Sequence, residues 1–103
     1  MSLFLGIDTS NYTTSVAVCD DNGVLLNEKK LLDVKEGEKG LRQSDAVFSH
    51  INNISHVVER IGKQDIIAVG CSSKPRDIEG SYMPCFKVGE ALADCIGSLL
   101  NVP

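Results

Sequence analysis

The segment from residue 43 to residue 71 constrains the fold of this chain more than any other. Apolar side chains recur there at the spacing of one helix face: Val47, Ile51, Ile54, Val58 and Ile61. Ser44 or Asp45 is placed to cap the helix, and an apolar strand follows it at residues 65–71. A strand that follows a crossover helix pairs in parallel with an earlier strand, so we expect an α/β fold with a right-handed crossover.

Three further strands are expected before this helix. Residues 2–8 form a nearly continuous apolar run, which predicts a central strand. Residues 14–20 and 24–33 predict two more strands, joined by an acidic hairpin turn that ends at Gly23. A last helix is expected over residues 87–100, and its inward-facing side chains are predicted to be Val88, Leu92, Cys95 or Ile96, and Leu99.

The element order β-β-β-α-β-α is that of the opening of a ribonuclease-H-like sheet, as in actin-like and sugar-kinase ATPase domains. That fold continues with a fifth strand, and the chain ends before it. We therefore interpret residues 1–103 as a single N-terminal lobe, a fragment of a larger two-lobed protein.

The composition excludes several classes of protein. Hydrophobic residues make up 43% and charged residues 23% of the chain, as in soluble globular domains. A net charge of −4 argues against a free-standing nucleic-acid-binding surface. We expect no signal peptide, since residues 1–3 lack a basic region and run straight into a strand. The sequence has no C-x-x-C pair and no apolar run of the roughly 18 residues that a membrane helix needs. We expect a cytoplasmic protein without membrane contact, in which Cys19 and Cys71 are small buried hydrophobes.

The stretch "LGIDTSNYTTSVAV", residues 5–18, resembles the N-terminus of the threonylcarbamoyl transferase family. Members of that family, long labelled O-sialoglycoprotein endopeptidases, transfer a threonylcarbamoyl group from its adenylate to the N6 atom of an adenosine in tRNA. Further similarity lies at residues 67–69, at Lys74-Pro75, at Val88-Gly89 and at residues 101–103. The resemblance covers the whole chain and implies a role in tRNA modification.

The departures from the family pattern indicate a divergent paralogue. Asp8 stands where the family has Glu, and Asn11, Tyr12 and Thr13 replace Cys, Asp and Glu. The family's H-x-x-x-H ligands for iron or zinc follow the segment that matches residues 101–103, and the chain stops before them. The resemblance therefore implies that this fragment holds no such metal and is inactive alone.

Hydroxyl, amide and carboxylate groups crowd the turn after the first strand. The candidate nucleotide- or phosphate-binding residues there are Asp8, Thr9, Ser10, Asn11, Thr13, Thr14 and Ser15. Such groups hydrogen-bond phosphate oxygens, and Asp8 is placed to hold a hydrated Mg²⁺, so the expected ligand is ATP or threonylcarbamoyl-adenylate. Lys74 and Arg76 follow the fourth strand at the same edge and are candidates to contact the phosphate. The alternative is that these side chains satisfy local backbone groups and that the basic loop is merely solvated.

The two histidines give no sign of metal or catalytic chemistry. His56 falls on the helix face opposite the apolar stripe and His50 at the border of the stripe, so both are expected at the surface or its boundary. An endopeptidase activity has no support from them. Three functions stay open: a transferase lobe, a non-catalytic scaffold partner of that enzyme, and a fragment of an acetate- or sugar-kinase-like ATPase. The expected partners are the missing second lobe or a second copy, tRNA-modification proteins and, for the full-length protein only, tRNA.

Overall fold

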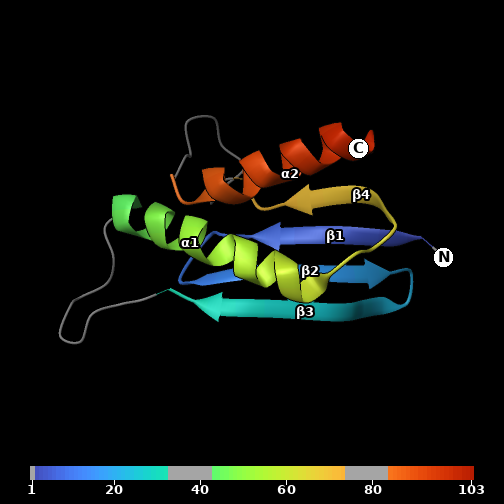
Figure 1. The fold of residues 1–103 in the computed structure, drawn as a ribbon, viewed down its shortest axis with the longest axis horizontal. Coiled ribbons are helices and arrows are strands. Elements are labelled where there is room, and N and C mark those ends of the chain that lie inside the picture. The colour runs from blue at the N-terminus through green and yellow to red at the C-terminus, as the bar shows by residue number, and fades with distance from the viewer. Residues whose placement is uncertain (1, 33–42, 74–83) are drawn as a thin grey trace.

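The computed structural model describes residues 2–32, 43–73 and 84–103. In this part of the chain a four-stranded sheet carries two helices (Figure 1). The strands are β1 (Leu3–Asp8), β2 (Thr13–Asp20), β3 (Gly23–Leu31) and β4 (Ile66–Cys71), and the helices are α1 (Gln43–Ile61) and α2 (Phe86–Leu100). The expected element order is confirmed. For most of the strands and helices, the observed ends lie within two residues of the predicted ones.

The sheet has the order β3-β2-β1-β4, which places β1 at its centre. Strands β1 and β2 are antiparallel, as are β2 and β3, whereas β4 returns parallel to β1 after the crossover through α1. The turn between β2 and β3 ends at Gly23, whose φ of 137° is reached readily by glycine and rarely by other residues. This mixed sheet confirms the predicted α/β fold of the actin-like, ribonuclease-H-like kind.

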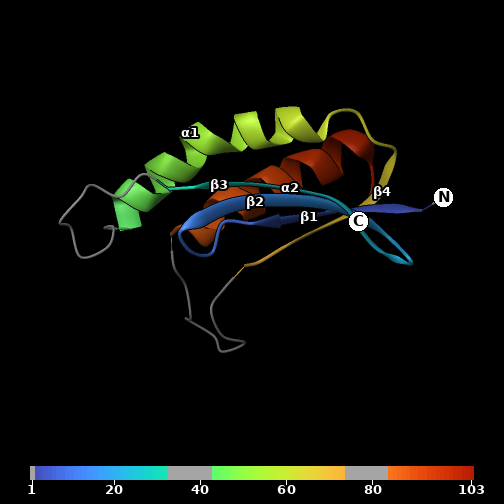
Figure 2. The same ribbon diagram turned by 90° about the horizontal axis from the view of Figure 1, so that it is seen from below.

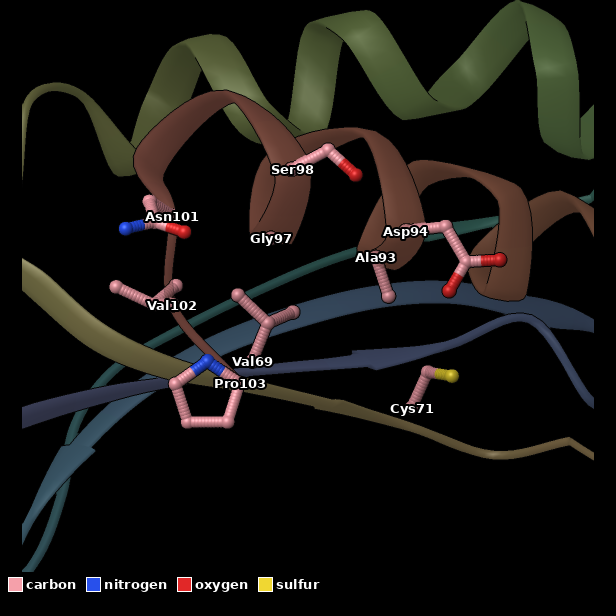
Figure 3. Close-up of a pocket in the computed structure, with 9 residues that line it drawn as sticks. All are labelled: Val69, Cys71, Ala93, Asp94, Gly97, Ser98, Asn101, Val102 and Pro103. Atoms are coloured by element: carbon pink, nitrogen blue, oxygen red, sulfur yellow. The ribbon is translucent and has the colours of Figure 1, made fainter.

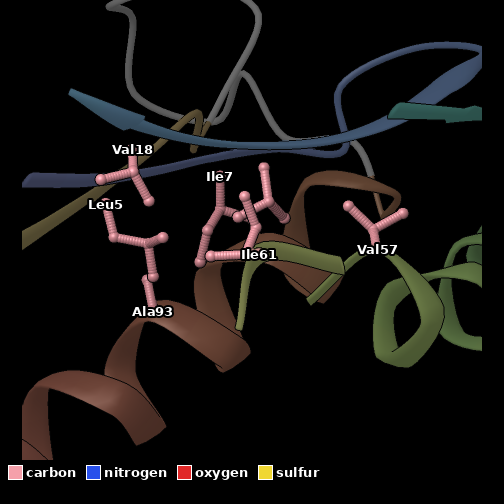
Figure 4. Close-up of a cluster of buried hydrophobic side chains, with 7 residues drawn as sticks. Leu5, Ile7, Val18, Val57, Ile61 and Ala93 are labelled. Carbon is pink, nitrogen blue, oxygen red and sulfur yellow. The ribbon is translucent and has the colours of Figure 1, made fainter. Parts of the chain in front are cut away.

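Both helices cover the same face of the sheet (Figure 2). Leu5 and Ile7 of β1, with alternate residues of β2, point toward the helices because strand side chains alternate between faces. They pack against Val57 and Ile61 of α1 and Ala93 of α2 (Figure 4). In the described residues, no helix lies on the other face of the sheet (Figure 2).

The buried face of α1 is rotated from the predicted stripe. Ile51, expected inside, has 54% of its surface exposed, whereas Val57 is fully buried. His50 is also fully buried, so its predicted place at the surface or its boundary is wrong. The physical reason is that the sheet beneath this part of α1 offers polar partners, which the imidazole binds, as described below.

Helix α2 packs on the sheet through its start and middle. Phe86, Gly89 and Ala93 are buried, whereas Leu99, predicted to face inward, has 86% of its surface exposed. A Cβ atom at Gly89 would lie 3.1 Å from both Ile7 Cγ2 and Thr9 Oγ1, so glycine permits the close approach of α2 to β1. Leu99 follows the buried Ala93 by six residues, which at 100° per residue turns it away from the helix face that packs on the sheet.

The cysteines are less buried than expected. Cys19 and Cys71 are half-buried rather than buried, and Cys95 is exposed, which leaves Ile96 as the inward-facing member of the predicted pair. The outer edge of β4 is partly occupied, because the Val69 N–H donates to the carbonyl of Pro103 at 2.9 Å. Neither helix in the described ranges is both long and apolar enough to span a bilayer.

Candidate functional site

Asp8 ends β1 at the carboxyl edge of the sheet, next to the end of β4. Its Oδ1 atom accepts a hydrogen bond from the Ser10 backbone N–H at 2.9 Å and another from the Ser72 hydroxyl at 2.8 Å. Ser72 is itself held to β1, since its N–H donates to the Ile7 carbonyl at 3.1 Å. The carboxylate is therefore fixed between the two strand ends.

The hydrogen bonds keep this carboxylate ionised. Partial burial raises the pKa of Asp8, but the hydrogen bonds from Ser10 and Ser72 outweigh it and lower the pKa below the ordinary value of 3.8. A fixed anion at the end of a central strand favours a cation or a cation-bound ligand over a free phosphate.

A hollow of about 350 Å³ lies beside Asp8 on the face of the sheet that carries no described helix. It is lined by Gly6, Ile7, Asp8, Ser15, Ala17, Gly70, Cys71 and Ser72. A Cβ atom built at Gly6 or Gly70 would meet nothing within 4 Å, so small residues keep this surface open. The hollow is apolar along the strands and polar at its Asp8 end.

Thr9 belongs to the interior rather than to the hollow. Its side chain is fully buried, its hydroxyl donates to the Cys85 carbonyl at 2.7 Å, and the same oxygen accepts the Gly89 N–H at 3.0 Å. The first four N–H groups of a helix have no partner within the helix, and Gly89 is the fourth residue of α2. Thr9 thus joins the β1–β2 turn to the start of α2.

Thr14 is likewise turned inward, toward α1. It is fully buried, and its Oγ1 atom lies 2.7 Å from His50 Nδ1. The other ring nitrogen, Nε2, lies 2.9 Å from the carbonyl oxygen of Asn11. The β1–β2 turn is therefore attached to both helices.

The structure divides the predicted site residues into two groups. Asp8, Ser10, Asn11, Thr13 and Ser15 are exposed or half-buried, whereas Thr9 and Thr14 are buried and hydrogen-bonded internally. Lys74 and Arg76 lie outside the described residues. Ser72 was missed by the sequence reasoning, because a serine after a strand carries no signal until the fold places it beside Asp8.

A second cavity of about 440 Å³ lies between the edge of β4 and α2 (Figure 3). Cys71 and Asp94 both line it. Burial raises the pKa of the Cys71 thiol above its ordinary 9.0, and the charges of Glu90 and Asp94 raise it further, so this thiol stays protonated and weakly nucleophilic. Among the described residues, no three His, Cys, Asp or Glu side chains form a set able to hold a metal ion.

Comparison with known proteins points in one direction. No family model matches the chain. The chain is 28% identical over 107 residues to the tRNA N6-adenosine threonylcarbamoyltransferase of Caldivirga maquilingensis, a match that covers 98% of this chain but 30% of that relative. Its fold is similar to that of YeaZ from Pseudomonas aeruginosa, with a TM-score of 0.58 and 13% identity over all of this chain and 42% of the other.

The chain thus spans less than a third of the length of the curated relative that it matches. It is a distant homologue of tRNA N6-adenosine threonylcarbamoyltransferase, built as an N-terminal-like domain with the fold seen in YeaZ. The resemblance stated from residues 5–18 is confirmed at this level.

Proposed function

We propose that this chain is the N-terminal lobe of a threonylcarbamoyltransferase-like protein and that the Asp8 hollow binds the phosphate end of a nucleotide. The observation that carries the proposal is the fixed, ionised Asp8 carboxylate, which the Ser10 N–H and the Ser72 hydroxyl hold at the carboxyl edge of the sheet. Open α/β sheets bind ligands at this edge.

Charge decides the form in which the nucleotide binds. Asp8 is anionic and the chain carries a net charge of −4, so a bare triphosphate is repelled. Mg²⁺ prefers oxygen ligands and keeps most of its waters, and one fixed carboxylate suits such a hydrated ion. Asp8 would hold the ion, and the hydroxyls of Ser10 and Ser15 would contact phosphate oxygens of ATP or threonylcarbamoyl-adenylate. Lys74 and Arg76 remain candidates for the same phosphate.

The complete reaction belongs to the longer protein. In this proposal the second lobe supplies the other wall of the cleft, and tRNA and the other tRNA-modification proteins bind only the full-length cytoplasmic protein. The lobe alone then binds nucleotide weakly and has no transferase activity, because half a cleft makes few contacts.

A titration of the ¹⁵N-labelled chain with ATP, with and without Mg²⁺, tests the proposal. We expect the amide signals of Ser10, Ser15 and Ser72 to move first, only with Mg²⁺ present, and the response to be lost in Asp8→Asn. Asp20→Asn is the matched control, since Asp20 Oδ1 accepts the Asn22 N–H at 2.8 Å in the same kind of turn at the other end of the sheet. Silence at millimolar Mg·ATP, or equal weakening by both variants, contradicts the proposal.

A second candidate, a non-catalytic partner protein, is favoured by the outer surface of α1. Phe48 and Ile51 have 66% and 54% of their surfaces exposed, one helical turn apart. Neighbouring exposed apolar side chains on a helix are typical of protein interfaces. If this surface mediates assembly with a second copy or another protein, Phe48→Asp abolishes complex formation in sedimentation experiments while leaving the Mg·ATP titration unchanged.

A further inference from the structure

His50 is the one titratable side chain of the described residues that is wholly buried. Its Nε2 atom lies 2.9 Å from the Asn11 carbonyl oxygen, which accepts hydrogen bonds and cannot donate them. Nε2 therefore carries the proton. In the neutral ring Nδ1 is then an acceptor, so the Thr14 hydroxyl, 2.7 Å away, donates to it.

Asn53 extends this arrangement one turn along α1. Its Nδ2 atom lies 3.4 Å from Thr14 Oγ1 and 3.3 Å from the Leu31 carbonyl oxygen. The bonds run in one direction, from Asn53 to Thr14, from Thr14 to His50 and from His50 to Asn11. No buried side-chain nitrogen or oxygen of the described residues lacks a partner. A connected set of hydrogen bonds between buried groups favours one conformation of the turn.

The turn is attached to α2 as well as to α1. Thr9 bonds Cys85 and Gly89, and the Cys85 thiol donates to the Ser10 carbonyl at 3.5 Å. Ser10, whose N–H fixes the Asp8 carboxylate, therefore lies between the attachment at Thr9 and the one at Asn11. Moving Asn11 would move Ser10 and with it the donor to Asp8.

We propose that neutral His50, with its proton on Nε2, is the positioning residue that sets the conformation of residues 10–14 for ligand binding at Asp8. As far as it concerns a nucleotide, this inference rests on the proposed function. His50 does not touch the hollow and acts only through Asn11 and Thr14.

The surroundings of His50 keep the ring neutral. Burial lowers the pKa of His50 below its ordinary 6.5, opposed by the Asn11 carbonyl and by the charge of Asp8. The groups that contact the ring from the turn and from β2 are the Asn11 carbonyl and the Thr14 hydroxyl, both uncharged. Among the charged groups of the described residues, Asp8 at the end of β1 acts on the imidazole, and its negative charge raises the pKa of His50.

The tautomer is measured directly on the unaltered chain. Nitrogen-15 NMR of the histidine rings at neutral pH is expected to show His50 as the neutral Nε2–H form. A proton on Nδ1, or a His50 ring that is charged at neutral pH, overturns the proposal without any variant.

Substitution then tests the positioning role. His50→Leu keeps an apolar volume and removes both bonds, so we expect amide exchange of Ser10 to Thr14 to speed up about tenfold or more, because the turn opens locally. The affinity for Mg·ATP is expected to fall about tenfold, since the turn must be ordered on binding. His50→Gln restores part of both, and His56→Leu changes neither. A folded His50→Leu chain with unchanged exchange of the turn contradicts the proposal.

Two further outcomes separate this inference from the proposed function. A wild-type chain that binds no Mg·ATP contradicts the nucleotide site, and the tautomer and the exchange data still decide the role of His50. Equal affinity in wild type and His50→Leu contradicts the positioning role alone. If His50→Leu does not fold, Thr14→Val replaces it: the loss of the hydroxyl must shift the His50 Nδ1 signal, and Thr14→Ser must not.

Discussion

The two turns of the β-meander share one local hydrogen bond and differ in their contacts with the rest of the molecule. In each, an aspartate Oδ1 atom accepts the backbone N–H two residues later: Asp8 from Ser10 at 2.9 Å, and Asp20 from Asn22 at 2.8 Å. The β2–β3 turn is exposed at residues 21–23. The β1–β2 turn is joined to both helices through Thr9 and His50. Identical turn chemistry thus serves a free hairpin in one place and a candidate binding site in the other.

The largest difference between the two turns is expected from the buried Thr9 hydroxyl of the β1–β2 turn. Thr9→Val keeps the shape of the side chain but removes the acceptor of the Gly89 N–H and one bond to the Cys85 carbonyl, which still accepts the Val88 N–H at 3.4 Å. We expect a loss of roughly 2 kcal/mol of unfolding free energy. Asp20→Ala, which removes the side-chain bond of the exposed turn, is expected to cost about 1 kcal/mol or less. Urea denaturation of both variants measures the contrast, and equal losses would refute the distinction between the turns.

Backbone geometry provides the next test, now on the exposed turn. A Cβ atom at Gly23 meets nothing within 4 Å, so Gly23→Ala is penalised only by the φ of 137°. We expect a loss of about 1 kcal/mol from this strain, seen in thermal or urea unfolding. Amide exchange at Ser10 to Thr14 should stay at the wild-type rate, and faster exchange there would show that the two turns are coupled.

Acidification should affect the β1–β2 turn, which His50 of α1 contacts, more than the exposed β2–β3 turn. Burial lowers the pKa of His50 in the folded chain below 6.5, so at mildly acidic pH the unfolded state binds more protons than the folded state. The contribution of the neutral His50 ring to stability is therefore fully present above pH 6.5, and it is lost progressively as the pH falls below that value. Urea midpoints measured from neutral pH down to about pH 5.5 should fall for wild type and His56→Leu and stay flatter for His50→Leu. Parallel declines in all three chains would contradict this.

The smallest effect is expected at the half-buried end of the site. Ser72→Ala removes one hydrogen bond to the Asp8 carboxylate, which changes the unfolding free energy by about 0.5 kcal/mol. The same loss raises the pKa of Asp8 toward 3.8, because the bond favours the charged form. Carbon-13 NMR titration of the Asp8 side chain in wild type and Ser72→Ala measures this shift. An unchanged pKa of Asp8 would show that Ser72 does not tune it.

Local sequence signals predicted both turns of the β-meander and the acidic residue at the end of β1. Gly23 after three polar residues predicts the exposed β2–β3 turn, because glycine readily adopts the positive φ that such a turn needs. Asp8 was recognisable at the end of a buried strand. The inward direction of Thr9 and Thr14 was not, because a threonine in a polar turn reads the same whether its hydroxyl meets water or a helix. Their partners lie 76 and 36 residues away along the chain, at Cys85 and His50.

The sequence by itself determined the order of the elements, the parallel return of β4 beside β1, and the acidic end of the central strand. These follow from periodicity, from glycine at a turn and from the handedness of crossovers, all of which act over short stretches of chain. The tertiary structure alone decided the rotation of α1, which buries His50 and Val57 and exposes Ile51. A helix buries the face whose groups match the surface beneath it, and that surface carries the Thr14 hydroxyl and the Asn11 carbonyl, which the strands assemble only when the sheet has formed.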